Sequence, residues 1–273
     1  MSVLLCLAGK EIRDGIRNRW IAATIVVLAA LALSLALLGS APVGAVKAST
    51  LSITVASLSS LSVYLIPLIA LMLSYDALVG EFERGTMQLL LTYPVARWQV
   101  ILGKFLGHVA ILVVAIVVGY GAAGLVVALR GGADSEGWRA FLFLMGSSAL
   151  LGAVFIGLGY LLSAVVRERA TAAGLAVALW LGLVVLYDLA VLGVLIADQG
   201  RIVTQTMVSI LMAVNPTDLY RVFNLTSFDG VAATAGMLGV EGGLGPVLSL
   251  VVLGGWVAAP VGATIVIFQR REL

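Results

Sequence analysis

Long apolar runs constrain the fold of this chain more than any other feature. A run of about 20 apolar residues, rising 1.5 Å per residue as a helix, spans the ~30 Å hydrocarbon layer of a bilayer. Backbone groups in lipid must pair internally, and runs without strict alternation favour helices over a closed barrel. We therefore expect an all-α membrane protein with six transmembrane helices, at about Trp20–Gly39, Leu51–Val79, Val100–Leu129, Ala140–Val166, Thr171–Ala197 and Val247–Phe268.

The composition supports a membrane location and excludes several other classes. Of the 273 residues, 62% are hydrophobic and 11% are charged, whereas a soluble domain carries roughly 25% charged residues. The net charge of +2 comes without the basic stripe that a nucleic-acid-binding protein needs. One cysteine and one histidine cannot form a disulfide framework or a Cys/His metal cluster.

Lys and Arg in the loops predict the orientation, because cytoplasmic loops carry an excess of them. The basic residues before the first run, between the second and third, between the fourth and fifth, and after the sixth outnumber those of the other loops. Both termini are therefore predicted to be cytoplasmic.

Residues 1–19 precede the first run and have helical amphipathic spacing. Leu5, Ala8, Ile12, Ile16 and Trp20 recur on one face. The basic side chains that would meet lipid headgroups are Lys10, Arg13, Arg17 and Arg19. We expect a helix lying in the cytoplasmic interface; the alternative is a charged flank that only fixes topology.

Residues 198–246 connect the fifth and sixth runs and are long for a linker. An amphipathic stretch ends at Asn215-Pro216, and Thr217 could cap a second short helix. We expect a small helical cap on the external side. Its candidate residues for contact with an external partner are Asn215, Asp218, Tyr220 and Arg221.

Residues 80–104 gather charges between two nearly uncharged runs. The stretch leaves the second span at its cytoplasmic end, turns at Pro94, and continues as a helix into the third span. Such an element could transmit force from a soluble partner into the helix bundle. The simpler alternative is a helical hairpin whose charges sit at the water boundary.

The order of residues in this stretch resembles the E-x-x-R-G-T, L-L, P, R, G-K pattern of type-2 ABC exporter permeases. The matching residues are Glu81, Arg84, Gly85, Thr86, Leu89, Leu90, Pro94, Arg97, Gly103 and Lys104. In that family the segment is a coupling helix that sits in a groove of a cytoplasmic ATPase. The resemblance implies that Glu81, Glu83 and Arg84 form ion pairs with the ATPase, and that Thr86 caps the coupling helix.

Three longer stretches, at Lys10–Trp20, Leu65–His108 and Asn215–Leu225, resemble the members of this family that serve assembly of the copper centres of nitrous oxide reductase. This resemblance implies a homodimer in a bacterial inner membrane, a cytoplasmic ATPase that holds ATP and Mg, and a periplasmic partner protein. A copper chaperone acting through the periplasmic partner is a further expectation. The cargo stays open between a sulfur species and a copper-related one.

Few residues are candidates for chemistry of their own. No G-x-x-x-x-G-K-[ST] motif is present, so ATP hydrolysis is expected in a separate subunit and no cofactor or metal in this chain. Asp188 lies near the middle of the fifth span, where a carboxylate is costly, and could line a transport path or pack against a Tyr or Thr. Asp76 could share that path, or anchor Arg84 or a helix end.

We therefore expect residues 1–273 to form a single permease domain of an ATP-driven transporter. One alternative is a stand-alone secondary transporter or channel, which would want several ionisable groups at membrane depth and broken helices. A membrane-embedded enzyme would want a Ser/His or paired-carboxylate constellation in the spans. Mechanical work on an external partner, without transport, stays compatible with the sequence.

Overall fold

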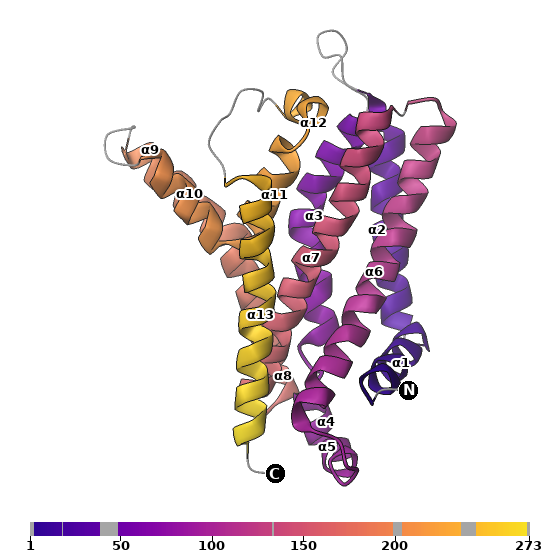
Figure 1. The fold of residues 1–273 in the computed structure, drawn as a ribbon, viewed down its shortest axis with the longest axis vertical. Coiled ribbons are helices and arrows are strands. Elements are labelled where there is room, and N and C mark those ends of the chain that lie inside the picture. Colours follow the sequence, from indigo (N-terminus) through magenta and orange to yellow (C-terminus); the bar gives the residue numbers. More distant parts are fainter. Residues whose placement is uncertain are drawn as a thin grey trace.

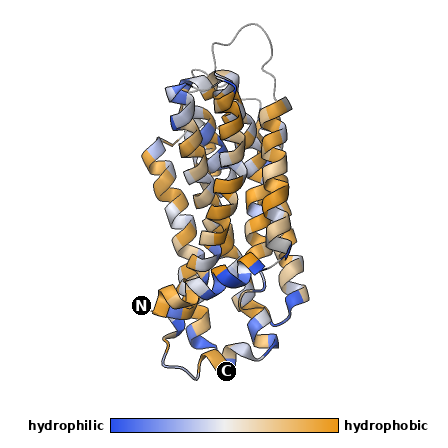
Figure 2. Ribbon diagram, turned by 90° about the vertical axis from the view of Figure 1, so that its right-hand side faces the viewer, coloured by the Kyte–Doolittle hydropathy of each residue, from blue (hydrophilic) through white to orange (hydrophobic). Residues whose placement is uncertain are grey.

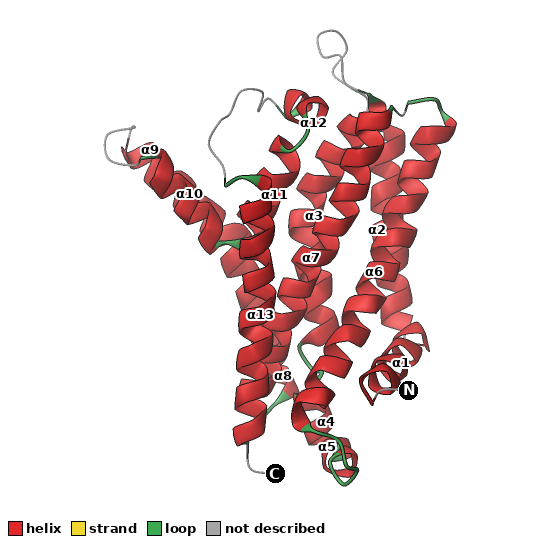
Figure 3. Cartoon of the chain, viewed as in Figure 1, coloured by secondary structure: helices red, strands yellow, loops and turns green. Residues whose placement is uncertain are grey.

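A computed structural model describes residues 3–17, 19–38, 49–132, 134–198, 204–235 and 244–271 of the chain. The described part is built from helices and loops (Figure 3). In chain order the elements are α1 Val3–Arg17, α2 Arg19–Leu38, α3 Thr50–Ser74, α4 Val79–Glu83, α5 Thr86–Leu90, α6 Arg97–Leu129, α7 Ser135–Val165, α8 Arg169–Trp180, the π-helix η1 Leu181–Leu186, α9 Tyr187–Asp198, α10 Gln205–Val214, α11 Pro216–Thr226, α12 Asp229–Thr234 and α13 Pro246–Arg270.

Within these ranges five helical segments are long and apolar enough to cross a membrane. They are Thr50–Glu83, Arg97–Leu129, Ser135–Val165, Arg169–Asp198 and Pro246–Arg270. A sixth is reached if α1 and α2, which meet at an angle of 72°, are counted together as one bent span. The chain is therefore a multi-pass helical membrane protein, and the five segments agree with the second to sixth apolar runs of the sequence.

The spans stand roughly side by side, and α1 lies across their lower end (Figure 1). Hydrophilic residues gather at that lower end, in α1 and in the short elements below the apolar spans (Figure 2). This arrangement fits an amphipathic α1 at the boundary between lipid and water.

The core of the bundle lies around α7. Of the most apolar stretch of α7, 61% is buried inside the chain, compared with 6% for the fifth span, which comprises α8, η1 and α9. Ser62 is a core polar side chain with two hydrogen-bond partners: its hydroxyl donates to the carbonyl of Leu58 (2.6 Å) and shares a hydrogen bond with the Tyr120 hydroxyl (2.6 Å). The Ser62 and Tyr120 hydroxyls are therefore buried without the free-energy cost of an unpaired polar group. The buried Ser59 hydroxyl has no hydrogen-bond partner among the described residues.

Side-chain caps define several helix starts. Ser49 accepts from the Ser52 amide at the start of α3, and Asp134 accepts from the Gly137 amide at the start of α7. Asn215 caps α11, and Pro216 occupies its first turn, where the missing N–H of proline costs nothing. The expectation that Thr217 caps this helix is therefore wrong, because Asn215 holds the cap position and accepts from the Thr217 amide. α7 likewise begins at Ser135, earlier than the expected start of the fourth span at Ala140.

Candidate coupling site between the second and third spans

The segment between α3 and α6 forms two short helices below the bundle (Figure 1). α4 and α5 meet at Gly85, whose φ of 70° lies in the left-handed region that glycine adopts without strain. Gly85 takes the N-cap position of α5, so the expectation that Thr86 caps this helix is wrong. The Thr86 hydroxyl instead donates to the carbonyl of Glu81 (3.3 Å), which ties α5 back to α4.

Lys104 of α6 is the centre of a buried ion network. Its Nζ lies 2.6 Å from Glu11 Oε1 of α1 and 2.9 Å from Glu81 Oε1 of α4. Lys104 is 3% exposed and Glu81 is 8% exposed. The more exposed Lys10 lies 3.7 Å from Glu81 Oε1 and 3.9 Å from Glu11 Oε1. A buried ammonium is tolerable only when it is paired and hydrogen-bonded, and here two elements that are remote in sequence supply the carboxylates.

His108 extends this network into α7. Its Nδ1 lies 2.8 Å from the Tyr160 hydroxyl, and its Nε2 lies 3.6 Å from Glu11 Oε2. The Tyr160 ring also packs edge-on against Phe105. The first turns of α6 therefore contact α1, α4 and α7 through one connected set of side chains.

A second set of contacts joins the same segment to the fifth span. Asp76 Oδ2 accepts from Arg169 Nη2 at 2.7 Å, and Glu83 Oε1 accepts from the Arg169 backbone amide at 2.8 Å. A Cβ atom at Gly80 would lie 3.3 Å from Arg84 Nη1, 3.3 Å from Asp76 Oδ2 and 3.4 Å from Arg169 Nε. A glycine at this position therefore leaves room for all three side chains. Asp76 is paired with Arg169 rather than with Arg84, the anchor expected from the sequence.

A third set of contacts joins the segment to the last span. Arg97 Nη1 donates to the carbonyls of Phe268 (3.0 Å), Gln269 (3.0 Å) and Arg271 (2.8 Å) at the end of α13. These carbonyls lack partners within the helix, so a guanidinium satisfies them. The Arg271 guanidinium lies 4.3 Å from the centre of the Phe82 ring, within cation–π range.

The predicted coupling residues divide into two groups. Glu81 and Lys104 are buried and paired with each other, and Arg97 is half-buried against α13. The exposed members are Glu83, Arg84, Thr86 and Pro94. Beside them two large side chains that the sequence did not single out for exposure, Leu89 (68%) and Tyr93 (67%), also face outward.

α1 carries exposed basic side chains at Lys10, Arg13 and Arg17, and Arg19 is exposed at the start of α2. Leu5 (61%) and Ile16 (75%) are exposed apolar side chains of α1. The Trp20 side chain lies outside the described part of the structure. The described side chains suit a helix at a membrane surface, with apolar groups for lipid and basic groups for headgroups.

The external residues named from the sequence face inward. Asn215 and Tyr220 are fully buried. Asn215 Nδ2 donates to the carbonyl of Leu183 (2.7 Å), and the Tyr220 hydroxyl lies 2.8 Å from Ser148 Oγ. Both residues therefore hold α11 against the bundle in this conformation, and their side chains are not available to a partner.

Asp188 is paired rather than isolated in the fifth span. Its Oδ2 lies 2.7 Å from Arg221 Nη2, and Asp218 Oδ1 lies 3.6 Å from Arg221 Nη1. Asp218 is outside the candidate spans, and its burial beside Asp188 raises its pKa to about 7. The partner of Asp188 is thus an arginine from the connection between the fifth and sixth spans, rather than a Tyr or Thr.

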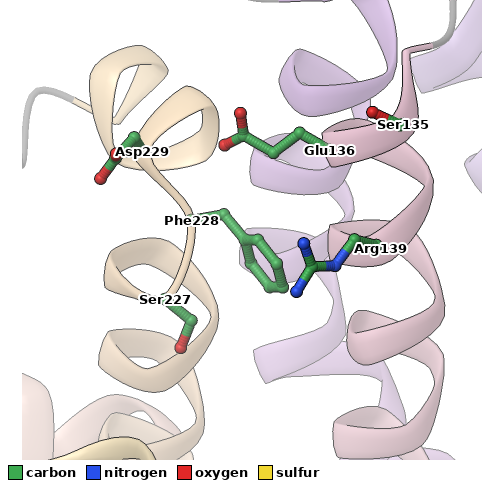
Figure 4. A pocket seen from close by; sticks show the side chains of 6 residues that line it. All are labelled: Ser135, Glu136, Arg139, Ser227, Phe228 and Asp229. Atoms are coloured by element: carbon green, nitrogen blue, oxygen red, sulfur yellow. The ribbon is translucent and has the colours of Figure 1, made fainter.

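A polar pocket of about 370 Å³ opens at the opposite end of the structure, away from α4 and α5. The N-terminal turn of α7 and the turn between α11 and α12 form its walls (Figure 4). Glu136 Oε1 accepts from the Gly230 amide at 3.0 Å, which fixes α12 against α7. The residues that line the pocket are Ser135, Glu136, Arg139, Ser227, Phe228 and Asp229.

Among the described residues there is no group of three or more His, Cys, Asp or Glu side chains that could hold a metal ion. In the buried network it is the Lys104 ammonium that lies between Glu11 and Glu81. These buried charges link α1, α4 and α6 electrostatically.

Known proteins resemble the chain over nearly its whole length. The model of the family described as ABC-2 family transporter protein matches residues 5–273. The chain is 42% identical over 270 residues to the probable ABC transporter permease protein NosY of Stutzerimonas stutzeri, with 97% of each chain covered. It is 43% identical over 284 residues to the protein of the same description from Pseudomonas aeruginosa, with 100% of each chain covered. A match of this length and identity places the chain in a family: it belongs to the ABC-2 transporter proteins.

Proposed function

We propose that this chain is the permease subunit through which a separate ATPase drives an export-type ABC complex. The observation that carries the proposal is the division within the cytoplasmic segment. Its charged side chains bind α1, α8 and α13, while Leu89 and Tyr93 are exposed at its tip. A rigid, multiply attached element with exposed large side chains suits a contact that must transmit force.

In this proposal Glu83, Arg84, Thr86 and Pro94 join Leu89 and Tyr93 in the contact with the ATPase. Glu81, Arg97 and Lys104 act from inside the chain, because their charges are already paired or hydrogen-bonded. ATP and Mg are held by the ATPase, and hydrolysis takes place there. This division refines the expectation that all of these residues touch the ATPase.

The fifth span supports a homodimer. Only 6% of its most apolar stretch is buried within the chain, yet Asp188 and Arg221 are half-buried there, with side chains 24% and 29% exposed. Charged groups at membrane depth face protein or water rather than lipid. We therefore place the second copy against this span, where it would shield the ion pair and line a path between the two copies.

The relatives' name extends the proposal to a biological role. We propose that the chain works with the ATPase NosF and the periplasmic protein NosD in the bacterial inner membrane, in assembly of the copper centres of nitrous oxide reductase. In this arrangement both termini are cytoplasmic, six helices cross the membrane, and the segment 198–246 caps the outer side. The cargo is a sulfur species or a copper-related one, with a copper chaperone acting through NosD.

The outer pocket gives the periplasmic partner a place to bind. Asn215 and Tyr220 are buried, whereas Glu136, Arg139 and Asp229 are exposed at the outer rim. Charges of both signs on two walls suit a polar contact with a protein surface. Asp218 and Arg221 would reach that partner only if the contact with Asp188 opened.

The alternative is a stand-alone secondary transporter or channel. Such a protein would need no contact at the α4–α5 tip, so exposed Leu89 and Tyr93 would be without a role. The π-helix in the fifth span is the feature that favours this alternative, since broken helices often line transport sites. Binding of an ATPase would support the permease function, and its absence would support the secondary transporter or channel.

The test is co-purification with the cognate ATPase in detergent, followed by measurement of ATP hydrolysis. Replacing Leu89 and Tyr93 by serine should lower the affinity for the ATPase about 30-fold, because central contacts of an interface are worth about 2 kcal/mol or more. The matched control is Leu129→Ser, which changes an exposed leucine (80%) at the far end of α6. Unchanged binding in the double variant, or no ATPase binding at all, would refute the proposal.

A further inference from the structure

α1 packs against α6 through two glycines. A Cβ atom at Gly103 would lie 2.7 Å from Leu7 Cβ, and one at Gly107 would lie 2.6 Å from Glu11 Cβ. Real Cβ atoms do not approach so closely, so glycine is what allows the two helices to touch. The G-x-x-x-G spacing at 103–107 is a common pattern in so glycine-rich a chain. In this structure it forms the surface of α6 against which the interfacial helix α1 packs.

Lys104 adds an electrostatic bond to this steric fit. It follows Gly103 directly, and its Nζ contacts Glu11 of α1 and Glu81 of α4 at 2.6 Å and 2.9 Å. Glu11 also lies 3.6 Å from His108, so its two carboxylate oxygens face two residues of the same α6 turn. Three elements that are distant in sequence therefore share one ammonium group.

Separation of α1 from α6 would break both contacts of Glu11 with α6 and leave Lys104 with Glu81 alone. Lys104 is 3% exposed, and the Glu11 side chain is 12% exposed. Removal of one partner of a buried pair is strongly unfavourable. The low-cost motion is one in which α1, α4 and the first turns of α6 stay together.

We propose that α1 takes part in the conformational change that the ATPase causes. It moves as one rigid body with the α4–α5 segment, and Glu11 is the positioning residue that binds it to Lys104. This inference rests on the proposed function, since the ATPase supplies the displacement. The exposed Leu5 and Ile16 would then stay in contact with lipid while α1 moves along the membrane surface. A charged flank that only fixes topology would need neither the glycine contact nor the buried pair.

The direct test is a distance measurement in the complete complex with the ATPase, reconstituted in lipid nanodiscs. The chain has one cysteine, Cys6, which is exposed on α1. A spin label there is paired with a second label at Trp98→Cys, at the start of α6, or at Val165→Cys, at the end of α7. The shortest distance of each distribution is compared between the nucleotide-free and ATP-bound states.

The proposal expects the Cys6–Trp98→Cys distance to stay constant while the Cys6–Val165→Cys distance changes. A nucleotide-dependent change in the first distance overturns it, because α1 would then slide on α6. Constant values for both distances in a complex that hydrolyses ATP also overturn it, because α1 would then take no part in the conformational change. If no ATPase binds, the proposed function itself is refuted. This outcome is distinguished from the others because no complex is purified.

Two variants test the contacts that carry the proposal. Glu11→Gln removes the charge, and Gly107→Ala forces the helices apart. Each should lower permease-dependent ATPase stimulation about fivefold or more, the size of a typical coupling between sites, with the ATPase still bound. The controls are Asp14→Asn, an exposed carboxylate of the same helix, and Gly121→Ala, a glycine of α6 with open space around it. Full stimulation by Glu11→Gln would overturn the role of Glu11 even if Gly107→Ala folds poorly, because Glu11→Gln keeps the side-chain shape.

Discussion

Replacement of Lys104 by methionine should be among the most destabilising single changes in this chain. The variant keeps the length of the side chain but removes the group that bonds Glu11 and Glu81 at 2.6 Å and 2.9 Å. Two buried carboxylates then lose their partner, and loss of one member of a buried pair costs about 3–5 kcal/mol. That is a large share of the roughly 5–15 kcal/mol by which most proteins are stable.

The measurement is reversible unfolding in mixed detergent micelles, followed by helical circular dichroism. Lys10→Met is the matched control, because Lys10 is 55% exposed and lies 3.7 Å from the same Glu81 oxygen. An exposed pair of this kind contributes at most about 1 kcal/mol. If Lys104→Met and Lys10→Met differ by less than about 1 kcal/mol in free energy of unfolding, the buried network does not stabilise the fold as argued.

A triple variant separates the charge from the packing. Adding Glu11→Gln and Glu81→Gln to Lys104→Met removes every charge of the network while the side-chain volumes change little. Replacement of a complete buried ion group by uncharged residues is often neutral. The triple variant should therefore recover most of the stability that Lys104→Met loses.

Three further predictions concern the end of α13 and the start of α11. Arg97→Gln should weaken the end of α13 by about 1 kcal/mol, because three carbonyls lose a donor, and hydrogen exchange at residues 268–271 should rise. Asn215→Ala should cost about 1–2 kcal/mol, since it removes the cap of α11 and the bond to the Leu183 carbonyl; equal exchange protection of α11 in both proteins would contradict this. The raised pKa of Asp218, about 7 beside Asp188, means that the folded state holds a proton that the unfolded state releases, so stability should fall as pH rises from about 4 to about 7 and level off above that. In Asp218→Asn this dependence should shrink, and an unchanged slope over the same pH range would show that another group titrates.

The spans were predictable because an apolar run needs no distant partner to reveal itself. The last run, predicted at Val247–Phe268, is observed as α13 Pro246–Arg270. The amphipathic spacing of residues 1–19 likewise indicated α1. These features depend on local periodicity, which the sequence displays directly.

The pairing of charges was not predictable in the same way. Glu11 and Lys104 are 93 residues apart, and nothing local indicates that they meet. Glu81 sits in a motif that suggested contact with another protein, and only the fold shows that its carboxylate is already paired. Ion pairs of this type depend on which helices are neighbours, and a single sequence does not state that.

The expectation that Asn215 and Tyr220 are accessible to a partner was wrong for a different reason. Asn215 and Tyr220 are polar residues near a proline turn, a pattern typical of surface loops. A signal for burial did exist, because Leu219, Tyr220 and Phe223 recur at helical spacing and are buried together. The hydroxyl of Tyr220 is accommodated because Ser148 of α7 offers a partner.

The π-helix at Leu181–Leu186 lies between α8 and α9 of the fifth span. A π-bulge amounts to one residue more than a regular helix would hold, and one residue corresponds to roughly 100° of rotation in an α-helix. The wider turn takes up that rotation, so the helices on either side keep the faces that they would have in an uninterrupted α-helix. Deletion of a single residue from this turn should therefore restore an α-helix and leave Asp188 beside Arg221.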